Sequence, residues 1–403
     1  MAKKLFIIIL VLSSSFFCFG ANTSLSVFDL KCENLRNPLG IDTFHPRFSW
    51  KIRSNKNETV QKLYQILAAT DTSLLNEDEA DLWNSGIVQS PESILVPYKG
   101  KPLLSGLVVY WKVRVWDETG NASSYARIAD FSVGLLANSD WKADYIGLPA
   151  NPEFKECPQL WKSFNVDKQK GKMLLYVNSL GYHEVYLNGE KVGKGVLAPA
   201  VSQYNKRSLS VTYDVSPLVK SGRNDLVIWL GSGWYLSGYP GVIDQGPLVK
   251  AQLEQVDGFK SEVIQVTDSS WKCRPSNYQR FGLLSPGNYG GELVDGSENS
   301  GDLSAGNPEN GSWLPAAVII VPDHEISSQM CENNQIQETI QAISVTQLDE
   351  KSYLVDMGKT LTGWSEIQFF ELKKSQEIKI EYCDHLAESG QFVNQNQVDK
   401  YIA

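Results

Sequence analysis

The chain has 403 residues, of which 42% are hydrophobic and 11% aromatic, and its formal net charge is −9. The composition is that of folded domains, and the length exceeds what one hydrophobic core usually serves, which indicates two or three domains. Binding to nucleic acid needs a concentrated basic surface, and the sequence offers none, so we expect no nucleic-acid partner.

The first 20 residues have the features of a signal peptide. A basic start, Lys3-Lys4, precedes an apolar segment over residues 5–12. Cys18 and Gly20 then supply the small side chains that signal peptidase requires. Cleavage after Ala21 and lipidation of Cys18 are the alternatives. We expect an exported protein, periplasmic or extracellular, and no later segment reaches the ~18 apolar residues of a membrane-spanning helix.

Apolar residues alternate with period two through the remaining chain, and helical periodicity is scarce. We therefore predict an all-β fold of tandem β-sandwiches, the first over residues 24–135. Its clearest strand is 110–116, where Trp111, Val113 and Val115 share the core face. The number and spacing of its short strands indicate a fibronectin type III-like or immunoglobulin-like domain. The stretch 72–81 is predicted as a surface turn or short helix.

A linker near 135–141 leads to a second β domain, expected over residues 141–325. Asn188-Gly189 separates two β-rich runs and predicts a two-residue hairpin turn. A third β domain is expected over residues 335–403, with strands at 366–369 and 377–381. The sequence ends while strands are still being added, so we expect this domain to be truncated and the natural protein to continue.

The cysteines leave two alternatives open. No zinc-type spacing occurs among them. An exported protein permits a disulfide such as Cys157 with Cys273, and buried free thiols are the other reading. After cleavage five cysteines remain, at Cys32, Cys157, Cys273, Cys331 and Cys383.

Three separated stretches carry distinctive motifs. These are NPLGID at 37–42 with PRFSW at 46–50, GYHEVYLNG at 181–189 with LGSGWY at 230–235, and VDMGK at 355–359 with EYCDHL at 381–386. Together and in this order they resemble the non-catalytic modules of bacterial α-L-rhamnosidases, glycoside hydrolase family 78. The resemblance implies a fibronectin-like domain, a jelly-roll-like N-terminal domain and the start of a concanavalin-like domain.

The resemblance also implies a reaction, the inverting hydrolysis of terminal α-L-rhamnose from glycosides or polysaccharides. Inversion needs two carboxyl groups ~6.5–9.5 Å apart, which the family places on a following (α/α)6 barrel. This sequence has almost no amphipathic helical segments, so we expect that domain to be absent and the chain alone to be inactive. We assign no catalytic residue, because turns and strand edges explain the available carboxylates and no nucleophile motif accompanies the histidines. The carboxylates considered are Asp295, Glu298, Asp356, Glu381 and Asp384.

Sugar binding is the function that the present residues favour. Aromatic rings stack on the apolar face of a deoxy sugar while polar side chains bond its hydroxyls. The alternative is that Trp234 packs between sheets. The resemblance also contains a departure, because many relatives carry an aromatic residue where this chain has Ala200 and Val201. The carbohydrate-binding candidates are Trp234, Tyr235, Tyr239, Asp244, Tyr204 and Asn205.

By the same resemblance, some jelly-roll-like domains of the family bind calcium through oxygen ligands. Calcium in the second domain is therefore a candidate cofactor, although no recognisable calcium loop is present, and no other cofactor is expected. The implied partner is a rhamnose-containing glycan. A free-standing carbohydrate-binding or adhesion protein made of β-sandwiches is the alternative function.

Overall fold

The computed structural model describes residues 25–151, 153–282, 287–297, 303 and 312–403. The predicted all-β fold of tandem sandwiches is confirmed: the described residues form strands, turns and two short 3-10 helices, Thr72–Leu74 and Asn138–Asp140. The stretch 72–81 is thus one helical turn, and Asp71 caps it by accepting a hydrogen bond from the Ser73 amide. The predicted signal peptide lies outside the described residues. No helix within the described ranges is long and apolar enough to cross a membrane.

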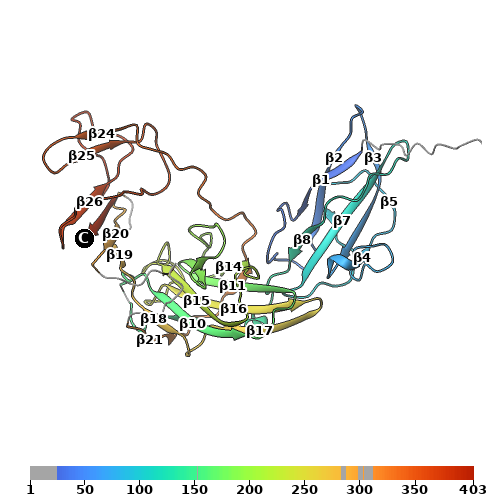
Figure 1. Cartoon of the computed structure of the whole chain (residues 1–403), viewed down its shortest axis with the longest axis horizontal. Coiled ribbons are helices and arrows are strands. Elements are labelled where there is room, and N and C mark those ends of the chain that lie inside the picture. The colour runs from blue at the N-terminus through green and yellow to red at the C-terminus, as the bar shows by residue number, and fades with distance from the viewer. Residues whose placement is uncertain (1–24, 152, 283–286, 298–302, 304–311) are drawn as a thin grey trace, which may run out of the picture.

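The first part of the chain forms two facing sheets, seen at one end of the molecule in Figure 1. One has three strands in the order β1-β2-β6, and the other has five, β4-β3-β7-β8 with β5 beside β3. The strands are β1 (Ser26–Cys32), β2 (Arg47–Arg53), β3 (Gln61–Ala69), β4 (Trp83–Asn84), β5 (Val88–Gln89), β6 (Val96–Pro97), β7 (Val108–Asp117) and β8 (Ala129–Ser132).

The core of this first sandwich is built on one stacked aromatic pair. The rings of Phe48 on β2 and Trp111 on β7 lie 4.2 Å apart with an interplanar angle of 11°, and both residues are fully buried. Trp111, Val113 and Val115 all face this core, as the alternation of the sequence predicts. The pair therefore joins the two sheets directly.

The second sandwich lies in the middle of Figure 1 and has larger sheets. Six strands follow the order β13-β12-β15-β10-β18-β21, and seven form β22-β9-β16-β11-β14-β23 with β17 beside β16. The strands are β9 (Ile146–Gly147), β10 (Gln159–Val166), β11 (Lys172–Leu180), β12 (Tyr182–Leu187), β13 (Glu190–Lys191), β14 (Arg207–Asp214), β15 (Gly222–Gly231), β16 (Leu248–Asp257), β17 (Lys260–Val266), β18 (Lys272–Arg274), β21 (Leu314–Pro315), β22 (Ala317–Val318) and β23 (Glu325–Ser328).

The predicted hairpin at Asn188-Gly189 is confirmed. It joins β12 to β13, with Leu187 paired to Glu190 across the turn. Asn188 has φ 54° and Gly189 has φ 87°, the left-handed values that a type I′ turn requires and that these two residue types tolerate.

The C-terminal part combines strands from distant parts of the sequence. A four-stranded sheet has the order β19-β20-β27-β26, and β24 and β25 form a separate hairpin. The predicted strand 377–381 is β26, but the predicted strand 366–369 is wrong. Among the described residues no strand pairs with it, and Phe369 instead stacks on Tyr401. The strands are β19 (Tyr278–Phe281), β20 (Gly291–Asp295), β24 (Ser344–Gln347), β25 (Tyr353–Asp356), β26 (Glu377–Glu381) and β27 (Val398–Ile402).

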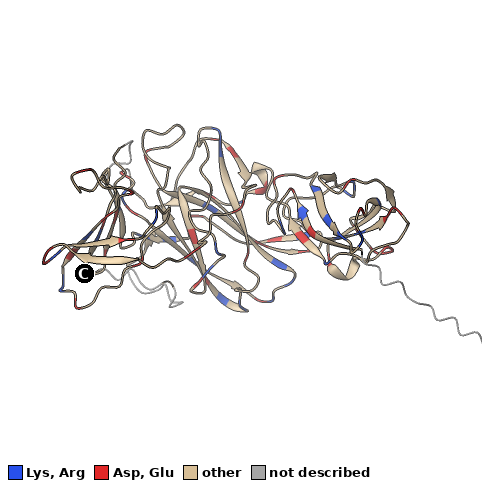
Figure 2. Ribbon diagram, turned by 90° about the horizontal axis from the view of Figure 1, so that it is seen from above, with Lys and Arg blue, Asp and Glu red and all other residues tan. Residues whose placement is uncertain are grey.

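A buried interface joins the first two sandwiches, so the segment predicted as a linker is tightly packed. Leu135 and Trp141 lie in an apolar cluster that also contains Tyr176 of β11 and Ile326 of β23. The Ser328 amide donates to the Asp42 carboxylate at 3.3 Å. Basic and acidic residues are interspersed along the whole length of the molecule (Figure 2).

All five cysteines of the described residues are free thiols, so the Cys157–Cys273 disulfide is not formed. Cys32, Cys157 and Cys273 are buried, Cys383 is half-buried and Cys331 is exposed. Burial raises the pKa of the Cys157 thiol to about 12. Three of the five thiols are thus protonated core residues.

A buried polar chain runs through the second sandwich at His183 on β12. Its Nδ1 lies 2.7 Å from the Ser179 hydroxyl and its Nε2 lies 2.9 Å from the Tyr213 hydroxyl. Burial lowers the pKa of His183 to about 3. The imidazole is therefore neutral in the folded protein at neutral pH, with both nitrogens satisfied.

We expect Phe48→Ala to lower the free energy of unfolding by about 3–5 kcal/mol, because it leaves a cavity beside the Trp111 ring. Urea denaturation followed by tryptophan fluorescence measures this change. Phe44→Ala is the control, because Phe44 is 40% exposed. A loss for Phe44→Ala equal to that for Phe48→Ala would contradict the assignment of the core.

Stability should also depend on His183 at mildly acidic pH. Its pKa is lowered in the folded state, so the unfolded chain binds the extra proton below pH ~6.5. The stabilisation is complete above that pH and is lost as the pH falls toward 3, by up to about 1.4 kcal/mol per pH unit. We expect His183→Gln to flatten the dependence of unfolding free energy on pH between 6 and 5. The exposed His45→Gln should leave the slope unchanged, and equal slopes for all three proteins would refute this account.

Candidate carbohydrate-binding site

The loop that follows β15, residues 232–246, carries four of the predicted binding residues. Gly233 at its start has φ 52°, and its backbone lies so close to Tyr182 that a Cβ would meet that ring at 2.8 Å. The Ser232 hydroxyl donates to the buried Phe154 carbonyl at 3.0 Å. A glycine and a small hydroxyl residue therefore let the chain leave the sheet in a tight turn.

Tyr235 fixes this loop to the segment that precedes β14. Its ring is fully buried and lies edge-on to Tyr204, with ring centroids 5.0 Å apart. Its hydroxyl accepts a hydrogen bond from the Ile243 amide at 3.3 Å. Tyr235 therefore cannot present its ring to a ligand and acts as a positioning residue.

Gly241 makes the second contact between the same two segments. It has φ +85°, and a Cβ added there would lie 2.1 Å from the Asn205 amide nitrogen. No residue with a side chain fits this approach without moving the loop. The packing of the two backbones thus depends on glycine at this position.

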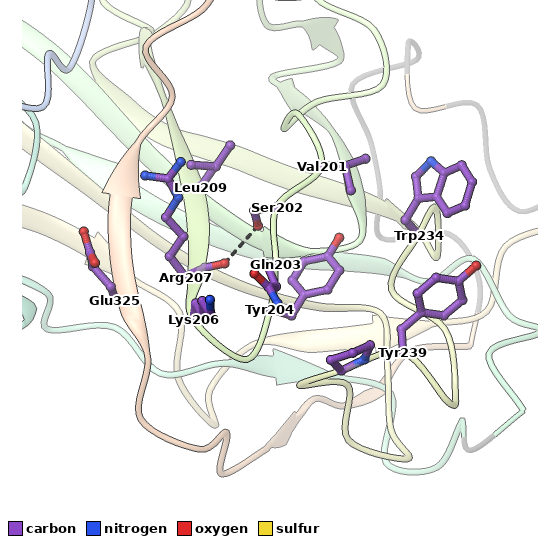
Figure 3. A pocket seen from close by; sticks show the side chains of 11 residues that line it. Val201, Ser202, Gln203, Tyr204, Lys206, Arg207, Leu209, Trp234, Tyr239 and Glu325 are labelled. Atoms are coloured by element: carbon purple, nitrogen blue, oxygen red, sulfur yellow. Dashed lines mark hydrogen bonds between the residues drawn. The ribbon is translucent and has the colours of Figure 1, made fainter.

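A pocket of about 660 Å³ lies between these segments and the edge formed by β14 and β23 (Figure 3). Trp234 is 44% exposed and Tyr239 is 38% exposed, and their rings lie 6.2 Å apart at 76°. Two exposed aromatic rings at one pocket offer flat apolar surfaces to a sugar ring. The pocket is lined by Val201, Ser202, Gln203, Tyr204, Lys206, Arg207, Leu209, Trp234, Tyr239, Pro240 and Glu325.

Three of the predicted binding residues line this pocket: Trp234, Tyr239 and Tyr204. Asp244 instead accepts a hydrogen bond from the Ser237 hydroxyl at 3.0 Å. Asn205 is exposed but does not line the pocket, and its backbone packs against Gly241. The fully buried Tyr235 packs edge-on against the Tyr204 ring.

Sequence reasoning missed the polar part of the lining. Lys206 and Arg207 directly follow Tyr204 and Asn205, so their position in the chain was a usable signal. Glu325 comes from β23, which pairs in parallel with β14 and sets Glu325 opposite Arg207. Only this long-range pairing brings Glu325 to the pocket.

The departure from the family pattern falls at the pocket itself. Val201 lines it and is 52% exposed, while the Ala200 amide donates to the Gln329 side chain at 2.7 Å. Because residue 201 is a valine, only the loop on the opposite side of the pocket, with Trp234 and Tyr239, offers exposed aromatic rings that could stack on a sugar.

The carboxylates considered from the sequence are occupied in local contacts where the structure describes them. Asp295 accepts from Ser297, Asp356 from the Gly358 amide and Asp384 from His385. Glu381 pairs with Lys379 at 3.0 Å. Glu298 lies outside the described residues.

A carboxylate pair that sequence reasoning missed lies on neighbouring strands, Glu292 on β20 and Asp399 on β27. Glu292 is exposed as a residue, yet desolvation of its carboxyl and the nearby Asp399 carboxylate raise its pKa. The Tyr382 hydroxyl donates to Asp399 at 2.8 Å. A carboxyl group with a raised pKa is what a general acid needs, so this pair is the one to vary in an activity test.

Two serines lie beside histidines in space, although the sequence has no nucleophile motif near them. Ser208 Oγ is 2.8 Å from His324 Nε2, and Ser179 Oγ is 2.7 Å from His183 Nδ1. Both serines are buried at 1% exposure or less. The other nitrogen of His324 faces the Pro322 carbonyl and that of His183 the Tyr213 hydroxyl. Neither arrangement contains the carboxylate of a hydrolytic triad.

Within the described residues, no group of three or more His, Cys, Asp or Glu side chains is placed to hold a metal ion. Calcium prefers six to eight oxygen ligands with carboxylates among them. The residues around the pocket include one carboxylate, Glu325, and so do not form a calcium site of this kind.

Comparison with known proteins covers nearly the whole chain. Residues 27–137 match the Rha78A-like N-terminal immunoglobulin domain, residues 168–338 the alpha-L-rhamnosidase N-terminal domain, and residues 346–403 the bacterial alpha-L-rhamnosidase concanavalin-like domain. An alpha-L-rhamnosidase of Formosa agariphila is 30% identical over 96% of this chain and 44% of its own length. One of Alteromonas sp. is 29% identical over 90% of this chain and 40% of its own. The chain thus spans less than half the length of these relatives.

Solved structures give the same result. The alpha-L-rhamnosidase from Dictyoglumus thermophilum superposes with a TM-score of 0.81 at 30% identity, over 94% of this chain and 44% of that one. The Streptomyces avermitilis alpha-L-rhamnosidase, solved with L-rhamnose, has the same fold, with a TM-score of 0.80 at 20% identity over 94% of this chain and 53% of that one. The chain therefore belongs to the α-L-rhamnosidases of glycoside hydrolase family 78 and corresponds to their N-terminal, β-sandwich part.

Proposed function

We propose that this chain is the glycan-recognition and scaffold part of an exported α-L-rhamnosidase that removes terminal α-L-rhamnose with inversion. The described residues contain no α-helix, so the helical domain that would carry the reaction is not among them. The chain by itself binds rhamnose-containing glycans and does not hydrolyse them. The names of its relatives, alpha-L-rhamnosidases, support this choice of sugar.

The pocket beside Trp234 carries the proposal. It lies on the second sandwich, where the exposed rings of Trp234 and Tyr239 are nearly perpendicular. Each ring offers one apolar face to a ligand. L-rhamnose is a deoxy sugar, and its methyl group extends the apolar face that an aromatic ring can cover. Gln203 and Glu325, which also line the pocket, provide acceptors and donors for the hydroxyls.

Calcium in the second sandwich stays a proposal to be tested together with the sugar, and it is not assigned to this pocket, whose lining has one carboxylate, Glu325. Titrations with and without calcium chloride distinguish a site that needs the ion from one that does not.

We expect Trp234→Ala to weaken binding of L-rhamnose and methyl α-L-rhamnoside at least tenfold, because a stacking surface is lost. Titration calorimetry or chemical-shift titration at millimolar sugar measures this effect. Trp364→Ala is the matched control, because Trp364 is 62% exposed in the C-terminal part and does not line the pocket. Absence of saturable binding by the unmodified chain, with or without calcium, would refute sugar binding.

The chain alone should release no rhamnose from an aryl α-L-rhamnoside. We expect this because the family places its catalytic carboxylates on a helical domain, and the described residues contain no α-helix. A release assay with the purified chain tests it, with Glu292→Gln as the decisive variant. Hydrolysis by the chain that Glu292→Gln abolishes would assign catalysis to the β20–β27 pair and overturn the proposal.

A further inference from the structure

Two adjacent cations, Lys206 and Arg207, line the pocket together with one acidic residue, Glu325. Lys206 and Arg207 are both exposed, and among the described residues neither forms an ion pair within 4.0 Å. Glu325 lies opposite Arg207 in the strand register. Burial raises the pKa of Asp42 and the Arg207 charge acts to lower it, but among the described residues neither carboxylate forms a salt bridge with Arg207. By contrast, Lys172 and Lys191 of the same sandwich pair with Asp214 and Glu184.

The backbone beneath these cations is firmly held. The amides of Lys206 and Arg207 both donate to the Gln203 carbonyl, at 2.8 and 3.0 Å. The Ser202 hydroxyl donates to the Arg207 carbonyl at 2.9 Å, which Figure 3 shows as the dashed line. The Glu325 amide donates to the Lys206 carbonyl at 3.1 Å. A fixed backbone therefore carries two exposed cationic side chains.

The cations share the pocket with the aromatic rings. In Figure 3, Lys206 and Arg207 stand between Glu325 on one side and Trp234 and Tyr239 on the other. A ligand whose ring covers the aromatic residues would bring its next substituent toward the cations. Guanidinium and ammonium groups at such a position bind carboxylate or sulfate oxygens by charge-assisted hydrogen bonds.

We infer that the pocket selects an acidic saccharide, one that bears a carboxylate or a sulfate ester beside the sugar that stacks on Trp234 and Tyr239. This inference rests on the proposed sugar binding and specifies its ligand. A neutral glycan would leave Lys206 and Arg207 solvated, whereas an anionic group on the glycan would form charge-assisted hydrogen bonds with them. Glu325 repels an anion placed on its own side and so favours one orientation of the ligand.

The test compares matched ligands on the full chain by calorimetry. They are methyl α-L-rhamnoside, a rhamnosyl-glucuronate disaccharide, its carboxyl-reduced neutral counterpart, and a sulfated L-rhamnose. At 20 mM salt we expect the acidic disaccharide to bind at least fivefold more tightly than its reduced counterpart. The preference should shrink at 300 mM salt, because screening weakens exposed charge interactions. The carboxylate and sulfate ligands show which anion fits better.

Variants separate the charges from the stacking surface. Lys206→Gln with Arg207→Gln should abolish the preference for the acidic ligand, so that the acidic disaccharide and its reduced counterpart bind with equal affinity. Trp234→Ala should weaken both ligands. Lys194→Gln is the control for a charge removed from an exposed residue outside the pocket.

The outcomes are distinct. Equal affinity for the acidic disaccharide and its reduced counterpart would overturn the inference and leave the proposed sugar binding standing. A preference that survives the double variant would also overturn it. No binding of any saccharide would refute the proposed function itself, and the inference with it.

Discussion

The pocket exists because the loop after β15 lies directly on the segment before β14. Two contacts make this possible, the bare backbone of Gly241 over Asn205 and the buried ring of Tyr235 against Tyr204. Trp234 and Tyr239 come from the loop, whereas Lys206 ends the segment and Arg207 begins β14. Separation of the two segments would divide the aromatic surface from the charges.

Local patterns in the sequence predicted the structural features that depend only on residues close together in the chain. The alternation in 110–116 predicted the core face of β7, and Asn188-Gly189 predicted the hairpin between β12 and β13. Both features follow from backbone geometry within a few residues. The same approach selected Trp234, Tyr239 and Tyr204, which line the pocket, and also Tyr235, which is buried. Aromatic residues serve cores and binding surfaces alike, and only the fold decides which one is exposed.

Features that depend on distant pairing could not be predicted in this way. Glu325 reaches the pocket because β23 adds in parallel to β14, more than a hundred residues earlier in the chain. The strand predicted at 366–369 had suitable residues but no neighbouring strand to supply hydrogen bonds. A β-rich run specifies a strand only when the tertiary structure provides its partner.

The strand pair that holds the charged side of the pocket also carries the interface with the first sandwich. β14 begins at Arg207 in the pocket and ends at Asp214, which binds Lys172 at 2.7 Å close to Asp130 of β8. On β23, Glu325 lies at the pocket, whereas Ser328 bonds Asp42 of the first sandwich. The first sandwich therefore supports the two strands whose register sets Arg207 opposite Glu325. None of its residues lines the pocket, so its contribution to the proposed recognition would be indirect, through these contacts with the two strands.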